Sequence, residues 1–142
     1  MKEIPFSNLL GLTLTSIDGK IGDETLTFET AEGRRFHLHY YPDCCASCSL
    51  NEVHGDFADL IGSPIVQAEE VCSGQGGGEK PSEYADSWTW TFYKLSTVKG
   101  SVTLRWLGES NGYYSESVTF EELPGEPRPA TLTNFADDFG AR

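Results

Sequence analysis

The residues best suited to chemistry lie close together between positions 37 and 45. They comprise two imidazoles, one carboxylate and two thiols: His37, His39, Asp43, Cys44 and Cys45. Histidines two positions apart on a strand share one face, at a spacing of about 6–7 Å. A cysteine beside a histidine can become a nucleophilic thiolate. One hypothesis is therefore a small-molecule or nucleotide-binding sponge, or a Cys-dependent enzyme, built on this cluster.

The same five residues also fit the solvent face of a strand that runs into a turn, with the thiols tucked beneath it. We favour this interpretation because the sequence shows no glycine motif for an oxyanion hole and no Asn or Asp that would orient a catalytic histidine. We therefore predict no catalytic residue here, and we expect the protein not to be an enzyme.

Cysteine spacing gives little support for a metal site. Three of the four cysteines lie within five residues, and Cys45 and Cys48 form a lone CxxC motif. A structural zinc site needs two further ligands, which His37, His39, His54 or Cys72 could supply, but the sequence has no second CxxC and no HxxxH motif. Adjacent cysteines bridge each other only with strain. We therefore predict free thiols, no metal and no cofactor.

A second polar cluster surrounds the Asn-Gly pair at 111–112. This pair is typical of a hairpin turn because both residues accept positive φ. Asn111 is followed by Tyr113, Tyr114 and Glu116, and Tyr and Asn side chains suit binding surfaces. The segment therefore predicts either a plain hairpin with an ion pair at its rim or an edge that recognises a partner.

Glu116 has the same strand parity as Val118 and Phe120. Its carboxylate is therefore expected to face the core. A carboxylate in that position needs a polar partner, and we expect Arg105 or a tyrosine hydroxyl to fill this role.

Alternation of apolar and polar residues, bounded by Gly, Pro, Asp and Asn, dominates the chain. It predicts seven strands, at residues 12–17, 25–30, 34–41, 64–72, 87–97, 101–106 and 113–122. One helical turn is expected at 56–62, with Asp56 as N-cap and Gly62 as its stop. The predicted fold is mainly β, with about seven antiparallel strands in a curled sheet or small sandwich and one or two short helices.

The last three predicted strands should form an antiparallel meander. Four large aromatic residues on them are expected to fill the core: Trp88, Trp90, Trp106 and Phe120. The strand at 64–72 begins with Ile65 and Val66, which make it apolar on both faces. It is therefore expected to lie inside a sheet.

The length of 142 residues fits one domain, which we place at residues 1–123. Within it, the Gly-rich residues 73–86 predict a flexible loop. Residues 124–142 comprise a Pro-rich break and a short tail. In the tail, Phe135 and Phe139 are four positions apart and form an apolar helical stripe, which docks either on its own domain or on a partner.

The composition is strongly acidic, with 10 Lys and Arg against 22 Asp and Glu and a net charge of −12. This charge disfavours DNA, RNA and anionic membrane surfaces. No apolar run approaches the roughly 18–20 residues of a membrane span. The acidic surface serves either solubility alone or a basic protein partner, such as one that itself binds nucleic acid.

Five motifs stand out along the chain. They are Asp-Cys-Cys at 43–45, Gly-Asp-Phe-Ala-Asp-Leu-Ile-Gly-Ser-Pro-Ile at 55–65, Trp-Thr-Phe-Tyr-Lys-Leu at 90–95, Gly-Ser-Val-Thr-Leu-Arg-Trp at 100–106 and Ser-Asn-Gly-Tyr-Tyr-Ser-Glu at 110–116. Together they resemble a family of small, mainly phage-encoded proteins of unknown function. The resemblance implies a phage or prophage source and a setting in the host cytoplasm, and it supplies no activity.

We therefore expect an acidic, non-enzymatic phage protein that binds and inhibits a host protein. An anti-defence inhibitor, similar in class to anti-CRISPR proteins, is the leading form of this hypothesis by analogy with other small acidic phage proteins. The expected binding residues are Asn111, Tyr113, Tyr114, Glu116, Phe135 and Phe139.

Overall fold

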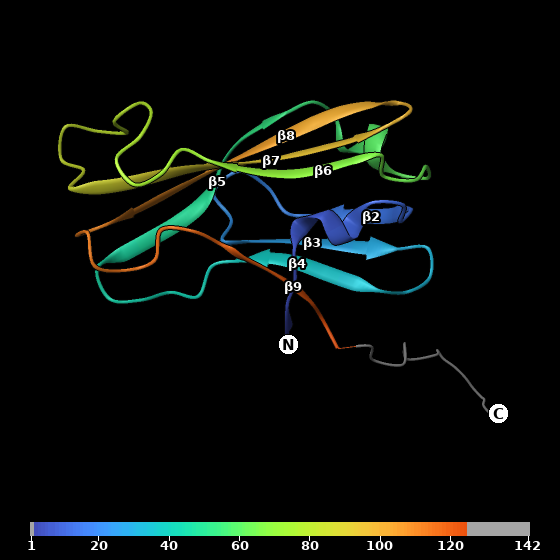
Figure 1. Ribbon diagram of the computed structural model, residues 1–142, viewed down its shortest axis with the longest axis horizontal. Coiled ribbons are helices and arrows are strands. Elements are labelled where there is room, and N and C mark those ends of the chain that lie inside the picture. The colour runs from blue at the N-terminus through green and yellow to red at the C-terminus, as the bar shows by residue number, and fades with distance from the viewer. Residues whose placement is uncertain (1, 125–142) are drawn as a thin grey trace.

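The computed structural model describes residues 2–124 (Figure 1). The expected binding residues Phe135 and Phe139 lie outside this range. The described part contains nine strands and two short 3-10 helices: β1 (Lys2–Glu3), η1 (Phe6–Leu9), β2 (Leu14–Asp18), β3 (Thr25–Thr30), β4 (Arg35–His39), β5 (Ala46–His54), η2 (Phe57–Leu60), β6 (Gln67–Cys72), β7 (Ser87–Thr97), β8 (Gly100–Ser110) and β9 (Thr119–Glu122). No helix within it is long and apolar enough to cross a membrane.

The strands form two antiparallel sheets that face each other (Figure 1). The first sheet has the order β1-β9-β4-β3-β2, and the second has the order β5-β8-β7-β6. The prediction of a mainly β fold is confirmed, and the small sandwich is the form it takes. The seven predicted strands correspond to β2, β3, β4, β6, β7, β8 and β9, to which the structure adds β1 and β5.

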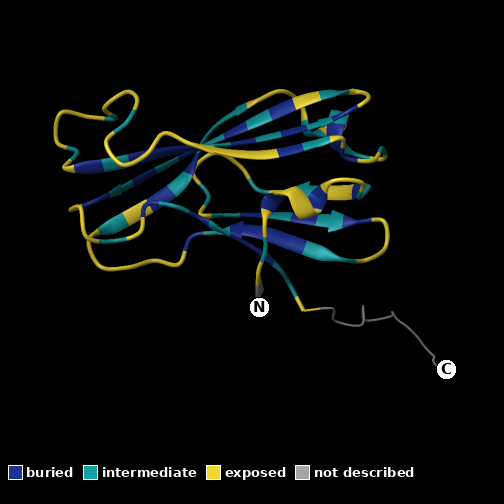
Figure 2. Ribbon diagram, viewed as in Figure 1, coloured by how far each residue is buried: buried dark blue, intermediate teal, exposed yellow. Residues whose placement is uncertain are grey.

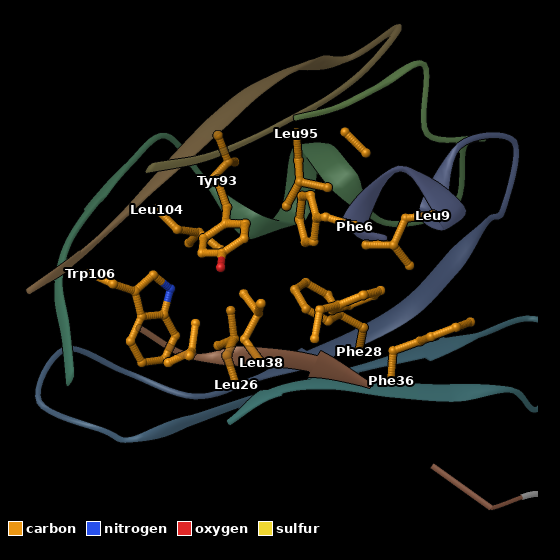
Figure 3. Close-up of a cluster of buried hydrophobic side chains, with 14 of the residues drawn as sticks. Phe6, Leu9, Leu26, Phe28, Phe36, Leu38, Tyr93, Leu95, Leu104 and Trp106 are labelled. Carbon is orange, nitrogen blue, oxygen red and sulfur yellow. The ribbon is translucent and has the colours of Figure 1, made fainter. Parts of the chain in front are cut away.

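The hydrophobic core fills the space between the two sheets (Figure 3). β3, β4 and β8 supply alternate residues to it, as the period of two requires. Figure 2 shows this alternation along the strands and the exposed residues gathered in the loops. Phe6 of η1 enters the same core, with its ring centroid 4.8 Å from Tyr93 and 5.1 Å from Phe120 in edge-to-face contacts, an arrangement that aromatic quadrupoles favour.

Two of the four aromatic residues predicted to fill the core do not belong to it. Trp106 and Phe120 do lie in the core. Trp88 and Trp90 lie on the outer face of β7, because Tyr93 and Leu95, which have the opposite parity, occupy its inner face.

The Gly-rich segment 73–86 covers these two outer tryptophans. The indole N–H of Trp88 donates to the carbonyl of Gly77 at 2.9 Å, and that of Trp90 donates to the carbonyl of Glu79 at 2.7 Å. On its other side, the Trp90 ring lies 4.6 Å below the guanidinium of Arg105, a favourable cation–π distance. Both indoles are therefore shielded from water without entering the core.

The predicted meander is also wrong in its third strand. β7 and β8 form the expected hairpin, but β9 pairs with β4 and β1 in the other sheet. The second neighbour of β8 is β5, a segment that the sequence left ambiguous.

The strand predicted to lie inside a sheet, β6, lies at a sheet edge. Ile65 is buried just before it, whereas Val66 is 60% exposed.

The helical turn predicted at 56–62 is confirmed as η2. The carboxylate of Asp56 accepts a hydrogen bond from the backbone N–H of Ala58 at 2.9 Å, which is N-cap geometry. Gly62 follows with a φ of +86°, where glycine carries no steric penalty.

Candidate functional site

One end of the sandwich brings together three loops that are far apart in the sequence: residues 41–45, 73–86 and 111–118 (Figure 1, left). Two hollows lie among them. One, of about 430 Å³, is lined by residues that include Cys45, Tyr84, Asp86 and Asn111. The other, of about 320 Å³, is lined by Gln75, Thr89, Gly112, Tyr113, Tyr114, Glu116 and Ser117. This loop end therefore gathers the predicted recognition residues that the structure describes.

Glu116 is the central charged group of the second hollow, and only 6% of it is exposed. Its carboxylate accepts hydrogen bonds from Thr89 Oγ1 at 2.7 Å and Ser110 Oγ at 2.5 Å. Burial disfavours the charged form, but hydrogen bonds from Ser110, Ser87, Thr89 and Gln75 outweigh burial and hold the pKa of Glu116 below its ordinary value. Glu116 is thus a buried anion whose hydrogen-bond partners are all neutral.

The expected partners of Glu116 were wrong, although its burial is as predicted. Arg105 points to the outer face of the second sheet. There it donates to Asn51 Oδ1 and forms an ion pair of 2.8 Å with Glu52. At Glu116, small hydroxyl groups stand where Arg105 was expected, because Ser110 and Thr89 face inward from the neighbouring strands β8 and β7.

The segment from 110 to 117 is held at several points. Tyr40 Oη donates to the Ser115 carbonyl at 3.2 Å, and Asn111 Oδ1 accepts from the Tyr113 backbone N–H at 3.2 Å. Gly112 has a φ of +99°, so the predicted Asn-Gly turn is present, but it leads into the crossover between sheets. The Tyr113 side chain remains 86% exposed on this anchored segment.

The two predicted histidines lie together on the outer face of the first sheet. Their rings stack with centroids 5.1 Å apart. His37 Nε2 lies 2.8 Å from Glu121 Oε1, and His39 Nδ1 lies 2.7 Å from Thr25 Oγ1. Tyr41 Oη donates to the same Glu121 oxygen at 2.5 Å. Burial opposes the charge on Glu121, but the hydrogen bonds from Tyr41 and His37 outweigh it and hold the pKa of Glu121 below its ordinary value.

The two adjacent thiols form a separate pair in the loop that follows β4. Cys44 Sγ and Cys45 Sγ are 3.1 Å apart, and Asp43 Oδ1 accepts from the Cys44 backbone N–H at 2.8 Å. Both thiols are free and exposed, whereas Cys48 is buried. Burial raises the pKa of Cys48 to about 12. Within residues 2–124, no hydrogen bond joins a thiol to an imidazole, so the predicted polar cluster divides into a histidine pair and a thiol pair.

The described part of the chain also contains no group of three or more His, Cys, Asp or Glu side chains placed to hold a metal ion.

Residues 7–120 match a family whose description is domain of unknown function, DUF7448. The chain belongs to DUF7448. The match includes both hollows and the thiol pair, and it ends just before Glu121. No curated protein and no solved structure matches the chain.

Sequence reasoning missed several residues that the structure places in these groups, among them Gln75, Thr89 and Glu121. Thr89 is 27 positions from Glu116, and Glu121 is 84 positions from His37. The His37–Glu121 contact arises from strand pairing, since the two residues are direct partners in the β4–β9 ladder. The Thr89–Glu116 contact arises from the segment between β8 and β9, which places Glu116 beside β7. The one signal in the sequence was parity, which placed Glu116 inward and therefore in need of donors.

The buried Glu116 carboxylate gives the DUF7448 domain a predictable acid sensitivity. Its folded pKa lies below the ordinary value of 4.5, so the unfolded chain binds this proton more readily. Glu116 therefore contributes stability above that value, and the contribution is lost as the pH falls through the folded pKa. We expect the difference in unfolding free energy between the wild type and Glu116→Gln to shrink on acidification, as measured by urea denaturation at a series of pH values. A difference that stays constant across the acid range would contradict this assignment.

Proposed function

We propose that this DUF7448 domain is a non-enzymatic binding protein whose loop end docks a basic protein partner. Glu116 would receive a cationic side chain, and the exposed Tyr113 would provide a contact surface beside it. The single observation that carries the proposal is the buried, ionised Glu116 with only neutral hydrogen-bond donors. Tyrosines and desolvated charged groups are among the residues that dominate the binding energy of protein–protein interfaces.

Hydrogen bonds to the Glu116 carboxylate satisfy its acceptor atoms without balancing its charge. The hydroxyls of Thr89 and Ser110 fill acceptor positions of the Glu116 carboxylate but do not cancel its negative charge. Because Glu116 is buried, water screens its charge poorly. It therefore attracts a cation more strongly than a surface carboxylate does. A guanidinium or ammonium group entering the hollow would also meet the ring of Tyr113 or Tyr114, whose faces attract cations.

The wider character of the partner follows from charge. A net charge of −12 steers a basic surface toward this protein and opposes anionic ones. Together with the resemblance of its motifs to small phage-encoded proteins, this favours a host protein that itself binds nucleic acid. Occupation of its basic surface would inhibit it, as an anti-defence protein would. The separation of the thiols from the imidazoles supports binding rather than Cys–His catalysis.

Binding of a fluorescent arginine-rich peptide tests the proposal. We expect Glu116→Gln and Tyr113→Ala each to weaken binding by about tenfold, which corresponds to about 1.4 kcal/mol. The affinity of the wild type should also fall as salt rises, because the attraction is electrostatic. Fluorescence anisotropy measures each affinity, and thermal melting checks that both variants remain folded.

Glu32→Gln is the matched control, since it removes one negative charge from the exposed turn between β3 and β4. It should leave the affinity close to that of the wild type. If Glu32→Gln weakens binding as much as Glu116→Gln, the peptide senses only net charge. The proposed site is then wrong.

A further inference from the structure

The adjacent thiols of Cys44 and Cys45 have a geometry that suits one class of ligand. Both side chains are exposed, and their sulfur atoms lie 3.1 Å apart without a covalent bond. No hydrogen bond joins either sulfur to an imidazole within residues 2–124, and the two sulfurs contact each other. Thiolate pairs are soft ligands and select soft, thiophilic centres.

A disulfide is a poor product for this pair. Neighbouring Cα atoms are about 3.8 Å apart, whereas bridged cysteines usually have Cα atoms about 4.4–6.8 Å apart. Direct oxidation therefore strains the backbone. An atom that bridges the two sulfurs does not need to bring them to bonding distance, and so it avoids this strain.

The sulfur separation also selects the geometry of the bridging atom. With bonds to sulfur of about 2.3 Å, a separation of 3.1 Å gives an S–X–S angle of about 85°. This is near the right angle of a pyramidal three-coordinate centre and well below the tetrahedral angle that zinc adopts. We propose that Cys44 and Cys45 form a bidentate site for trivalent, thiophilic metalloid compounds, of which organic arsenic(III) oxides are the test class.

The backbone fixes the two thiols in this arrangement. Cys45 has a φ of +65° and is the only non-glycine residue in the described part of the chain with a positive φ. A non-glycine residue in this region is strained and persists only where the surroundings impose it. The Asp43 carboxylate accepts a hydrogen bond from the backbone N–H of Cys44, the residue before Cys45. The hollow beside Cys45, bordered by Tyr84 and Asn111, leaves room for the third substituent of the bound atom.

The reaction with an organic arsenic(III) oxide is balanced without any redox partner. Each thiol sulfur forms one bond to arsenic, the As=O bond breaks, and the two thiol protons leave with the oxygen as water. Arsenic keeps its oxidation state and its organic group. The two sulfurs and that group complete its three bonds, so a third protein ligand is not needed.

Phenylarsine oxide tests the site on the full-length protein. We expect the wild type to bind one equivalent, seen by intact mass, with the loss of two titratable thiols. The adduct should resist an excess of a monothiol and be released by a dithiol, because two linked bonds must open together. Cys44→Ser and Cys45→Ser should each lose this resistance, with affinity reduced by roughly a hundredfold.

Cys72→Ser is the matched control, because Cys72 is exposed but lies on β6 away from the pair. It should bind phenylarsine oxide as tightly as the wild type. The proposal is overturned if a monothiol releases the adduct from the wild type as readily as from Cys44→Ser, or if Cys72→Ser loses the adduct. It is also overturned if zinc ions alone protect Cys44 and Cys45 more strongly than phenylarsine oxide does. Melting curves confirm that each variant is folded.

Discussion

Replacement of Trp106 by alanine is expected to lower the free energy of unfolding by about 3–5 kcal/mol. The Trp106 side chain is 1% exposed and lies between the two sheets (Figure 3). Its removal leaves a cavity that rigid strands on both sides cannot close. Urea denaturation followed by circular dichroism measures the loss. The slope of the unfolding free energy against urea concentration should match that of the wild type.

Trp88→Ala and Trp106→Phe are the matched control variants. Trp88→Ala, on the outer face of the neighbouring strand, should cost much less, because the indole of Trp88 is covered only by the 73–86 loop. Trp106→Phe should also cost little, since the Trp106 N–H is buried with no hydrogen-bond partner among residues 2–124, and an unpaired buried donor is itself costly. Equal losses for Trp106→Ala and Trp88→Ala would mean that the inner face of the second sheet is wrongly assigned.

The error over the tryptophans shows what periodicity leaves open. β7 alternates Trp88, Trp90 and Phe92 with Thr89, Thr91 and Tyr93, so either set can face inward. The deciding information lies in register, because the two-residue turn at 98–99 pairs Leu95 with Val102 and Tyr93 with Leu104. Cross-strand partners share a face, and the side with aliphatic partners is the inner one. Combining parity with the turn would have identified the correct face.

β5 was harder to predict for a different reason. Its pairing with β8 shifts register between Leu50 and Glu52, and a bulge of this kind interrupts the period of two. The crossover that moves the chain from β8 to β9 was equally hidden, because Asn111-Gly112 is as compatible with a crossover turn as with a hairpin. The candidate site depends on both features, so the sequence could place its residues in one segment but could not supply their partners.

A single methyl group at position 108 is expected to damage the fold and the candidate site together. Gly108 lies on β8 where the returning chain crosses it, and a Cβ there would overlap the backbone carbonyl of Glu116. Backbone atoms on both sides have little freedom to move, so Gly108→Ala should cost at least about 1–3 kcal/mol. Relief of the overlap requires movement of the 110–117 segment, which carries Glu116 away from Thr89 and Ser110.

Gly108→Ala should therefore lower thermal stability and also weaken binding of the arginine-rich peptide, by about as much as Glu116→Gln. Gly11→Ala separates the two effects. Gly11 has a φ of +83° with open space around its Cβ position, so alanine there costs about 1 kcal/mol through backbone strain alone. Because Gly11 is remote from the loop end, peptide binding should be unchanged. If Gly108→Ala keeps full affinity despite its lost stability, then the close crossing at Gly108 does not position Glu116, and the carboxylate is held by its hydroxyl donors alone.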